Sequence, residues 1–123
     1  MVYLKNNTTN SQIIQKKICE SAVKKQQMKI KEIITVLEEM APLAYAEDFD
    51  NVGLLTGNQD NEATGILVCH DALENVIEEA ITKNCNLVVC FHPILFSGLK
   101  KITGSNYVER ALIKAIKNDI SIY

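Results

Sequence analysis

Two histidines and a neighbouring aspartate are the residues of this sequence whose types and positions could support metal binding or catalysis. His70 and Asp71 follow one apolar run, and His92 follows another. Ligands of open parallel sheets bind outside the carboxyl ends of the strands, so we expect the three side chains at one edge. Asp48 and Asp50, from an acidic loop, could approach the same edge. Imidazole with carboxylate suits Zn²⁺, Fe²⁺, Mn²⁺ or Ni²⁺, and such a cation would lower the pKa of a bound water molecule.

Each of these residues also has a structural interpretation. Asp71 precedes a predicted helix, and Glu74 follows three residues later, so the pattern favours a capping box over a metal ligand. His70 is placed at a strand-to-helix corner, where a solvated side chain and a functional one are equally expected. Pro93 biases His92 towards an extended backbone, which fixes the direction of the imidazole. That local pattern is equally consistent with a metal ligand and with a buried histidine whose two ring nitrogens both have hydrogen-bond partners.

Other chemical motifs are weaker. The sequence has no Gly-x-Ser-x-Gly elbow, and Cys90 belongs to an apolar run in which a thiol is expected to be inert. The segment SGLKKITGSN does not have the spacing of a phosphate-binding loop, because Lys100 and Lys101 precede Gly104. Asn106 and Glu109 are better interpreted as a helix cap.

The elements that must position these residues alternate between helix and strand. Apolar spacing predicts helices over residues 30–40, 73–81 and 106–117, and continuous apolar runs predict strands over 64–69, 87–91 and 120–123. The order β-α-β-α-β predicts an α/β protein with a mostly parallel sheet and flanking helices. The sequence ends within the last predicted strand, so we expect an incomplete domain with an exposed apolar edge and marginal stability.

Composition and charge narrow the class of protein. The 123 residues fit one small domain, and the net charge of −2 gives no support for a nucleic-acid partner. Four cysteines without a C-x-x-C pair favour a reducing, cytoplasmic location over a disulfide framework. No apolar run is long enough to predict a membrane span. Residues 1–27 carry five lysines against Glu20, and this polar segment is predicted to be a flexible basic extension.

Three blocks resemble a known family. They read EDFDNVGLLTGN, ILVCHDALENVIEEAITKNCNLVVCFHPILFSGLKKITG and ALIKAIKNDISIY. Their order resembles the amino-terminal half of the Nif-three-like family, whose members are labelled GTP cyclohydrolase I type 2 homologues. The resemblance covers residues 28–123. It implies an α/β protein that assembles into a homohexameric ring and holds a centre of two divalent metal ions.

The resemblance also implies particular ligands. The family pattern reads His-His-Pro with both histidines as ligands, whereas this sequence has Phe91, His92 and Pro93. Phenylalanine cannot bind a metal ion, so His92 is the expected ligand and the second metal position is weakened. The remaining ligands of the family would lie beyond residue 123, so the chain alone should bind metal poorly and be inactive. His70, Asp71, Asp50 and Asn51 are expected to line or support the pocket.

Two functions remain open from the sequence. The first is a metal-dependent hydrolase that acts on a nucleotide-like small molecule, with catalytic residues that the sequence does not identify. The second is a non-enzymatic metal-binding scaffold or regulatory protein in which ring assembly matters more than turnover. The presence of Phe91 favours the second, because a site without a catalytic metal pair tolerates the loss of one imidazole.

Overall fold

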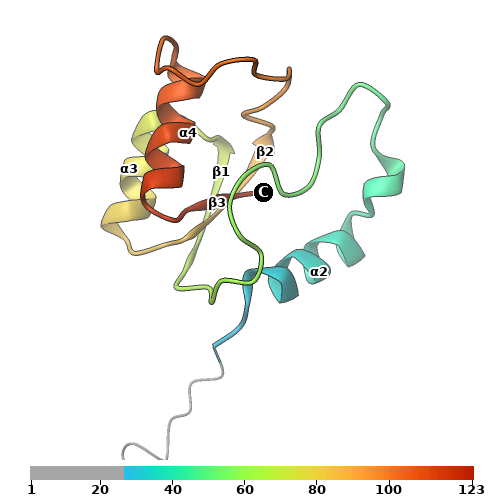
Figure 1. The fold of residues 1–123 in the computed structure, drawn as a ribbon. Coiled ribbons are helices and arrows are strands. Elements are labelled where there is room, and N and C mark those ends of the chain that lie inside the picture. Colours follow the sequence, from blue (N-terminus) through green and yellow to red (C-terminus); the bar gives the residue numbers. More distant parts are fainter. Residues whose placement is uncertain (1–26) are drawn as a thin grey trace, which may run out of the picture.

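The computed structural model describes residues 27–123, which form a three-stranded sheet with helices on both faces (Figure 1). The elements in chain order are α2 (Ile30–Met40), the 3-10 helix η1 (Leu43–Tyr45), β1 (Ile66–Asp71), α3 (Glu74–Thr82), β2 (Leu87–His92), α4 (Tyr107–Lys117) and β3 (Ser121–Ile122). The strand order is β1-β2-β3, and both pairs are parallel. The predicted α/β class is confirmed. The predicted extension lies outside the described residues, apart from its last residue.

Two apolar cores cover the central strand from both faces. Ile77 of α3 and Leu112 of α4 pack with Val88 in one core. Ile30 of α2 packs with Leu87 in the other core. Because Leu87 and Val88 are both fully buried, neither face of the first half of β2 can carry a polar side chain. This burial explains why the run shows no polar alternation.

Strands β1 and β2 end side by side. Cys69 pairs with Cys90, and two residues later Asp71 pairs with His92. Both strands continue beyond their predicted ends, since β1 includes Asp71 and β2 includes His92. Because the strands are parallel, these last residues lie at the same edge of the sheet.

Helix α4 begins at a dense cap built around Glu109. Asn106 is the N-cap, and its side-chain oxygen accepts a hydrogen bond from the backbone N–H of Glu109. The Glu109 carboxylate in turn accepts from the backbone N–H groups of Thr103 and Ser105, from both hydroxyls, and from the Asn106 amide. These donors lower the pKa of Glu109 to about 2, and the two backbone N–H groups make the largest contributions. The Asn106–Glu109 cap expected from the sequence is confirmed.

Replacing Glu109 with glutamine should destabilise the chain at neutral pH, with a melting temperature several degrees lower. The folded-state pKa of about 2 lies below the ordinary value of 4.5. The carboxylate therefore stabilises the fold above pH 4.5, and this contribution is lost as the pH falls from 4.5 towards 2. Thermal unfolding followed by circular dichroism across this range should show the variant and the wild type converging in acid. The control Glu39→Gln, on the exposed side of α2, should show no such convergence.

One face of the sheet is only partly covered. Ile66 and Val68 of β1 pair with Leu87 and Val89 of β2, so the four side chains lie on the same face, the one that α2 packs against. Helix α2 covers the β2 residues, but Val68 is 77% exposed and Ile66 is 46% exposed. Phe91 is also 77% exposed, and we call Ile66, Val68 and Phe91 together the uncovered face.

No helix within residues 27–123 has both the length and the apolar character to cross a bilayer.

Because contiguous exposed apolar side chains favour association, we expect the chain to self-associate through the uncovered face. Val68→Lys should shift the population towards monomer in sedimentation velocity. The matched control is Ile116→Lys, which places the same charge at a half-exposed position of α4. An equal shift in both variants, or a monomeric wild type, would show that the uncovered face does not drive association.

Candidate metal centre

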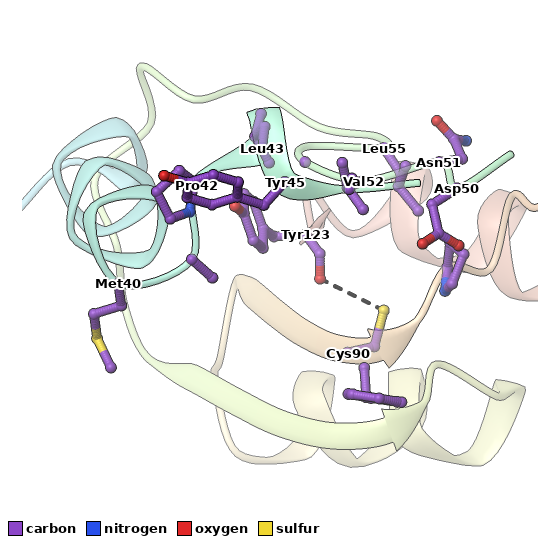
Figure 2. Close-up of a pocket in the computed structure, with 15 residues that line it drawn as sticks. Met40, Pro42, Leu43, Tyr45, Asp50, Asn51, Val52, Leu55, Cys90 and Tyr123 are labelled. Carbon is purple, nitrogen blue, oxygen red and sulfur yellow. Dashed lines mark hydrogen bonds between the residues drawn. The ribbon is translucent and has the colours of Figure 1, made fainter. Parts of the chain in front are cut away.

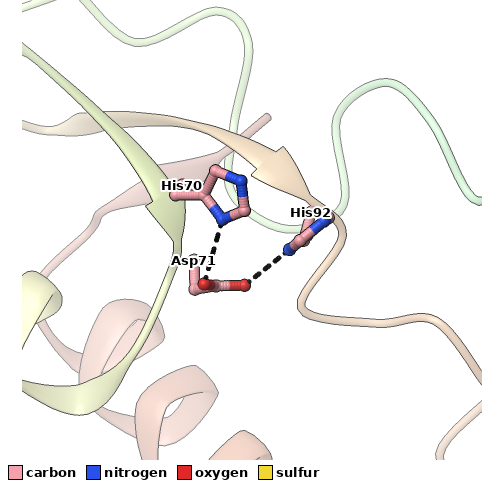
Figure 3. A group of neighbouring side chains, drawn as sticks. All are labelled: His70, Asp71 and His92. Atoms are coloured by element: carbon pink, nitrogen blue, oxygen red, sulfur yellow. Dashed lines mark hydrogen bonds and ion pairs between the residues drawn. The ribbon is translucent and has the colours of Figure 1, made fainter.

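Asp71 and His92 form the centre of a polar cluster at the carboxyl ends of β1 and β2 (Figure 3). The register places the two residues opposite each other, and Asp71 Oδ1 lies 2.8 Å from His92 Nδ1. The second carboxylate oxygen, Oδ2, lies 3.2 Å from His70 Nδ1. One carboxylate therefore contacts two imidazoles, one from its own strand and one from the neighbouring strand.

His70 reaches this cluster from the other face of the sheet. Its ring stacks on Phe91 with a centroid separation of 5.3 Å and an interplanar angle of 25°. The same ring meets His92 edge-on, at 4.3 Å between centroids and 80° between planes. His70, Asp71 and His92 each offer a ligand atom, and these atoms lie within 4.8 Å of one another. The cluster therefore has the size of a metal site.

The electrostatics of the cluster favour a cation. The hydrogen bond with His92, followed by the one with His70, lowers the pKa of Asp71 below its ordinary value. The carboxylate is therefore ionised at neutral pH. His70 and His92 have side chains that are 67% and 53% exposed, so an ion can reach the cluster from solvent. An anionic carboxylate between two accessible imidazoles is a suitable donor set for a borderline divalent cation.

The structure changes the interpretation of Asp71. The prediction that it caps the following helix is wrong, because α3 has Leu73 as its N-cap and no side-chain cap. Strand pairing with His92 extends β1 through Asp71, so its carboxylate lies at the sheet edge instead of over the first turn. Glu74, the other residue of the expected capping box, instead accepts a hydrogen bond through Oε1 from Arg110 Nε at 2.8 Å.

The structure brings His70, Asp71 and His92 together at one edge of the sheet, as expected from the sequence, but the place of His70 within its strand differs from the expected one. It lies within β1 and not at a corner after the strand, and it belongs to the cluster in which His92 was the only expected ligand. A signal for this was present in the sequence. Aligning Cys69 with Cys90 places Cys-His-Asp beside Cys-Phe-His, with His70 next to Phe91 and Asp71 next to His92.

Asp50 and Asn51 do not join the cluster. Within residues 27–123, the group of ligand atoms close to one another contains neither Asp48 nor Asp50. Asp50 and Asn51 instead line a separate cavity of about 490 Å³, bounded by Phe91 and Tyr123 (Figure 2). The Asn51 side-chain amide donates a hydrogen bond to the carbonyl of Leu95, which ties the loop to the segment that follows His92.

A second cavity adjoins the cluster directly. It has a volume of about 310 Å³, and Asp71 and His92 form part of its wall together with Phe96, Asn106 and Tyr107. Its wall comes from the ends of β1 and β2, the segment after β2 and the start of α4. A small molecule in this cavity would contact both cluster residues and two aromatic rings. The smaller cavity is therefore the one with access to the candidate chemistry.

The thiols near the cluster are unsuitable as nucleophiles. Burial, with smaller contributions from Cys90 and Asp71, raises the pKa of Cys69 to about 11. Burial also raises the pKa of Cys90, and both cysteines are free. Because the thiolate is the reactive form of cysteine, these side chains act as small apolar groups in the core.

Comparisons with known proteins identify the family. The family model described as Duf34/NIF3 (NGG1p interacting factor 3) matches residues 28–123. A GTP cyclohydrolase 1 type 2 homologue of Clostridium acetobutylicum is 41% identical over 96 residues, which are 78% of this chain and 36% of that protein. A Staphylococcus epidermidis homologue of the same name is 40% identical over 95 residues, 77% of this chain and 26% of that one. The chain thus spans about a quarter to a third of these relatives.

Solved structures give the same result. The Bacillus cereus protein related to NIF3 is 34% identical with a TM-score of 0.76, and the match covers 79% of this chain and 27% of that one. Reduced HcgD from Methanocaldococcus jannaschii is 33% identical with a TM-score of 0.72, over 78% of this chain and 38% of that one. The resemblance noted in the sequence is confirmed, and the chain belongs to the DUF34/NIF3 family.

Proposed function

We propose that the chain contributes a divalent-metal site to a protein of this family, formed by His70, Asp71 and His92. The observation that carries the proposal is one carboxylate in contact with two imidazoles at the ends of neighbouring parallel strands. Two imidazoles and a carboxylate fit Zn²⁺, Fe²⁺, Mn²⁺ or Ni²⁺. The sequence alone offered one ligand and predicted poor binding; three donors within 4.8 Å support a stronger site.

We further propose that this site serves a hydrolase that acts on a nucleotide-like small molecule. A cation bound there would lower the pKa of a coordinated water molecule. The cavity of about 310 Å³ gives a flat ring access to Asp71 and His92, with Phe96 and Tyr107 available for stacking. The name of the relatives, GTP cyclohydrolase 1 type 2 homologue, supports a guanine nucleotide as the first substrate to test. In this proposal His70, Asp71 and His92 surround the ion.

A non-enzymatic metal-binding scaffold is the second candidate function. Phe91 occupies the position where the family resemblance implies a further metal-binding imidazole, and its exposed ring forms part of the uncovered face. A site with fewer ligands and a large apolar surface suits assembly more than turnover. Homohexamer formation and a cytoplasmic location remain predictions within this proposal.

One experiment separates the two functions. The full 123-residue chain is loaded with Zn²⁺ or Mn²⁺ and incubated with GTP, and opening of the guanine ring is followed by the change in its absorbance. Turnover that is lost in His92→Ala supports the hydrolase. Retained metal without turnover of GTP or other nucleotides contradicts a hydrolase activity of this chain, and failure of the chain to retain any metal contradicts both functions.

A further inference from the structure

The two contacts of Asp71 determine which nitrogen of each histidine is available to a ligand. Asp71 Oδ1 faces Nδ1 of His92, and Asp71 Oδ2 faces Nδ1 of His70. Two ring nitrogens therefore face one carboxylate, and the oxygens of an ionised carboxylate act as acceptors only. Each Nδ1 must therefore carry the proton and donate it to the carboxylate. In a neutral imidazole the other nitrogen, Nε2, is then unprotonated and has a free lone pair.

The positions of the rings agree with this assignment. In both rings the second nitrogen lies on the side away from Asp71 (Figure 3). More than half of each histidine side chain is exposed, so solvent ions can approach it. Phe91 stacks on the His70 ring and limits its rotation. Metal-binding histidines commonly donate their other ring N–H to a carboxylate, which fixes the tautomer and the ring orientation.

We propose that Asp71 is a positioning residue that holds both imidazoles in the Nδ1–H form, so that Nε2 of His70 and Nε2 of His92 are the protein atoms that bind the cation. This inference rests on the proposed metal site and adds its ligand atoms. In this refinement Asp71 holds the two imidazoles and does not itself bind the ion. The remaining coordination positions are left to water or substrate, which suits a nitrogen-preferring cation such as Zn²⁺.

The composition of the chain makes the test direct. The sequence contains two histidines, His70 and His92, so every imidazole signal in a spectrum of the chain without a tag comes from the cluster. Long-range ¹H–¹⁵N correlation spectra of the metal-free full chain, recorded at a pH where both rings are neutral, should show both as Nδ1–H tautomers. Addition of Zn²⁺ should shift both Nε2 signals while each Nδ1 stays protonated.

Asp71→Asn is the matching variant, because the amide keeps the shape of the carboxylate but has one acceptor oxygen instead of two. It should lower Zn²⁺ affinity about 10- to 100-fold, the usual effect of losing an orienting group, and return at least one ring to the Nε2–H form. Asp48→Asn, on the exposed loop and outside the cluster, should change neither measurement. Asp71→Glu, which restores the charge on a longer side chain, should recover part of the affinity.

The outcomes distinguish this inference from the proposed function. Zn²⁺ that binds with a shift at Nδ1, or metal-free rings in the Nε2–H form, would overturn the role given to Asp71 and leave the metal site standing. If Asp71→Asn keeps the spectrum of a folded protein but loses all Zn²⁺ binding, Asp71 is a direct ligand. That result would also overturn the positioning role of Asp71 and leave the metal site standing. Absence of any Zn²⁺-induced shift in the wild type would overturn both proposals.

Discussion

Zn²⁺ affinity is expected to fall about 100-fold or more when His92 is replaced with alanine. His92 is the residue that joins β2 to the cluster, and its Nδ1 lies 2.8 Å from Asp71 Oδ1. Its removal takes away one of two imidazoles, so the loss should exceed the 10- to 100-fold effect that is typical of an orienting group. Competition with a chromophoric chelator measures the change.

The control for this prediction is Ser97→Ala. Ser97 lies in the segment after β2 and contributes to the wall of the same cavity, but it is not part of the cluster. Its replacement should leave affinity unchanged. If His92→Ala binds Zn²⁺ as tightly as the wild type while both remain folded, the ion binds elsewhere and the assignment of His92 is wrong.

Gly57→Ala is expected to have the largest effect on stability. Gly57 has a φ of 104°, a conformation that costs a residue with a Cβ about 1–3 kcal/mol. A Cβ at this position would also clash with Ser121 Oγ and lie 2.5 Å from Ser121 Cα, and Ser121 is fully buried in β3. Because backbone must move to relieve this clash, we expect the free energy of unfolding to fall by about 3 kcal/mol or more.

Urea denaturation followed by circular dichroism tests this prediction with a control of the same kind. Gly98 has no atom within 4 Å of an added Cβ, so Gly98→Ala should change stability by less than about 0.5 kcal/mol. Equal effects of the two variants would mean that the loop before β1 does not pack against β3 as described. A selective loss at Gly57 would confirm that close approach.

Helices and strands of this chain could be predicted because their signals are local. The apolar stripe of α2 lies within one segment, and the cap of α4 involves Asn106 and Glu109, three residues apart. Continuous apolar runs indicated buried strands, and the alternation of strands with helices indicated parallel pairing. These features depend on neighbours in the sequence, and the structure has them at nearly the predicted positions.

The role of Asp71 could not be predicted in the same way. The local pattern of Asp71 and Glu74 is the pattern of a helix cap, but pairing of Asp71 with His92, 21 residues away, determines where the carboxylate lies. The same limit applies to Asn51, whose hydrogen bond to Leu95 spans 44 residues. Nothing in the segment around Asn51 specifies its distant partner. The partner of Asp71 becomes visible only when the two strands are aligned, so tertiary pairing overrode the local signal of a helix cap.

The central claim is that the ends of β1 and β2 bring two imidazoles to one divalent cation, and X-ray absorption at the zinc edge tests it most directly. We predict that the full chain loaded with one equivalent of Zn²⁺ shows two imidazole nitrogens at about 2.0–2.1 Å, completed by oxygen. Sulfur neighbours at about 2.3 Å would place the ion on cysteines. Either that result or a shell of oxygen alone would contradict the account.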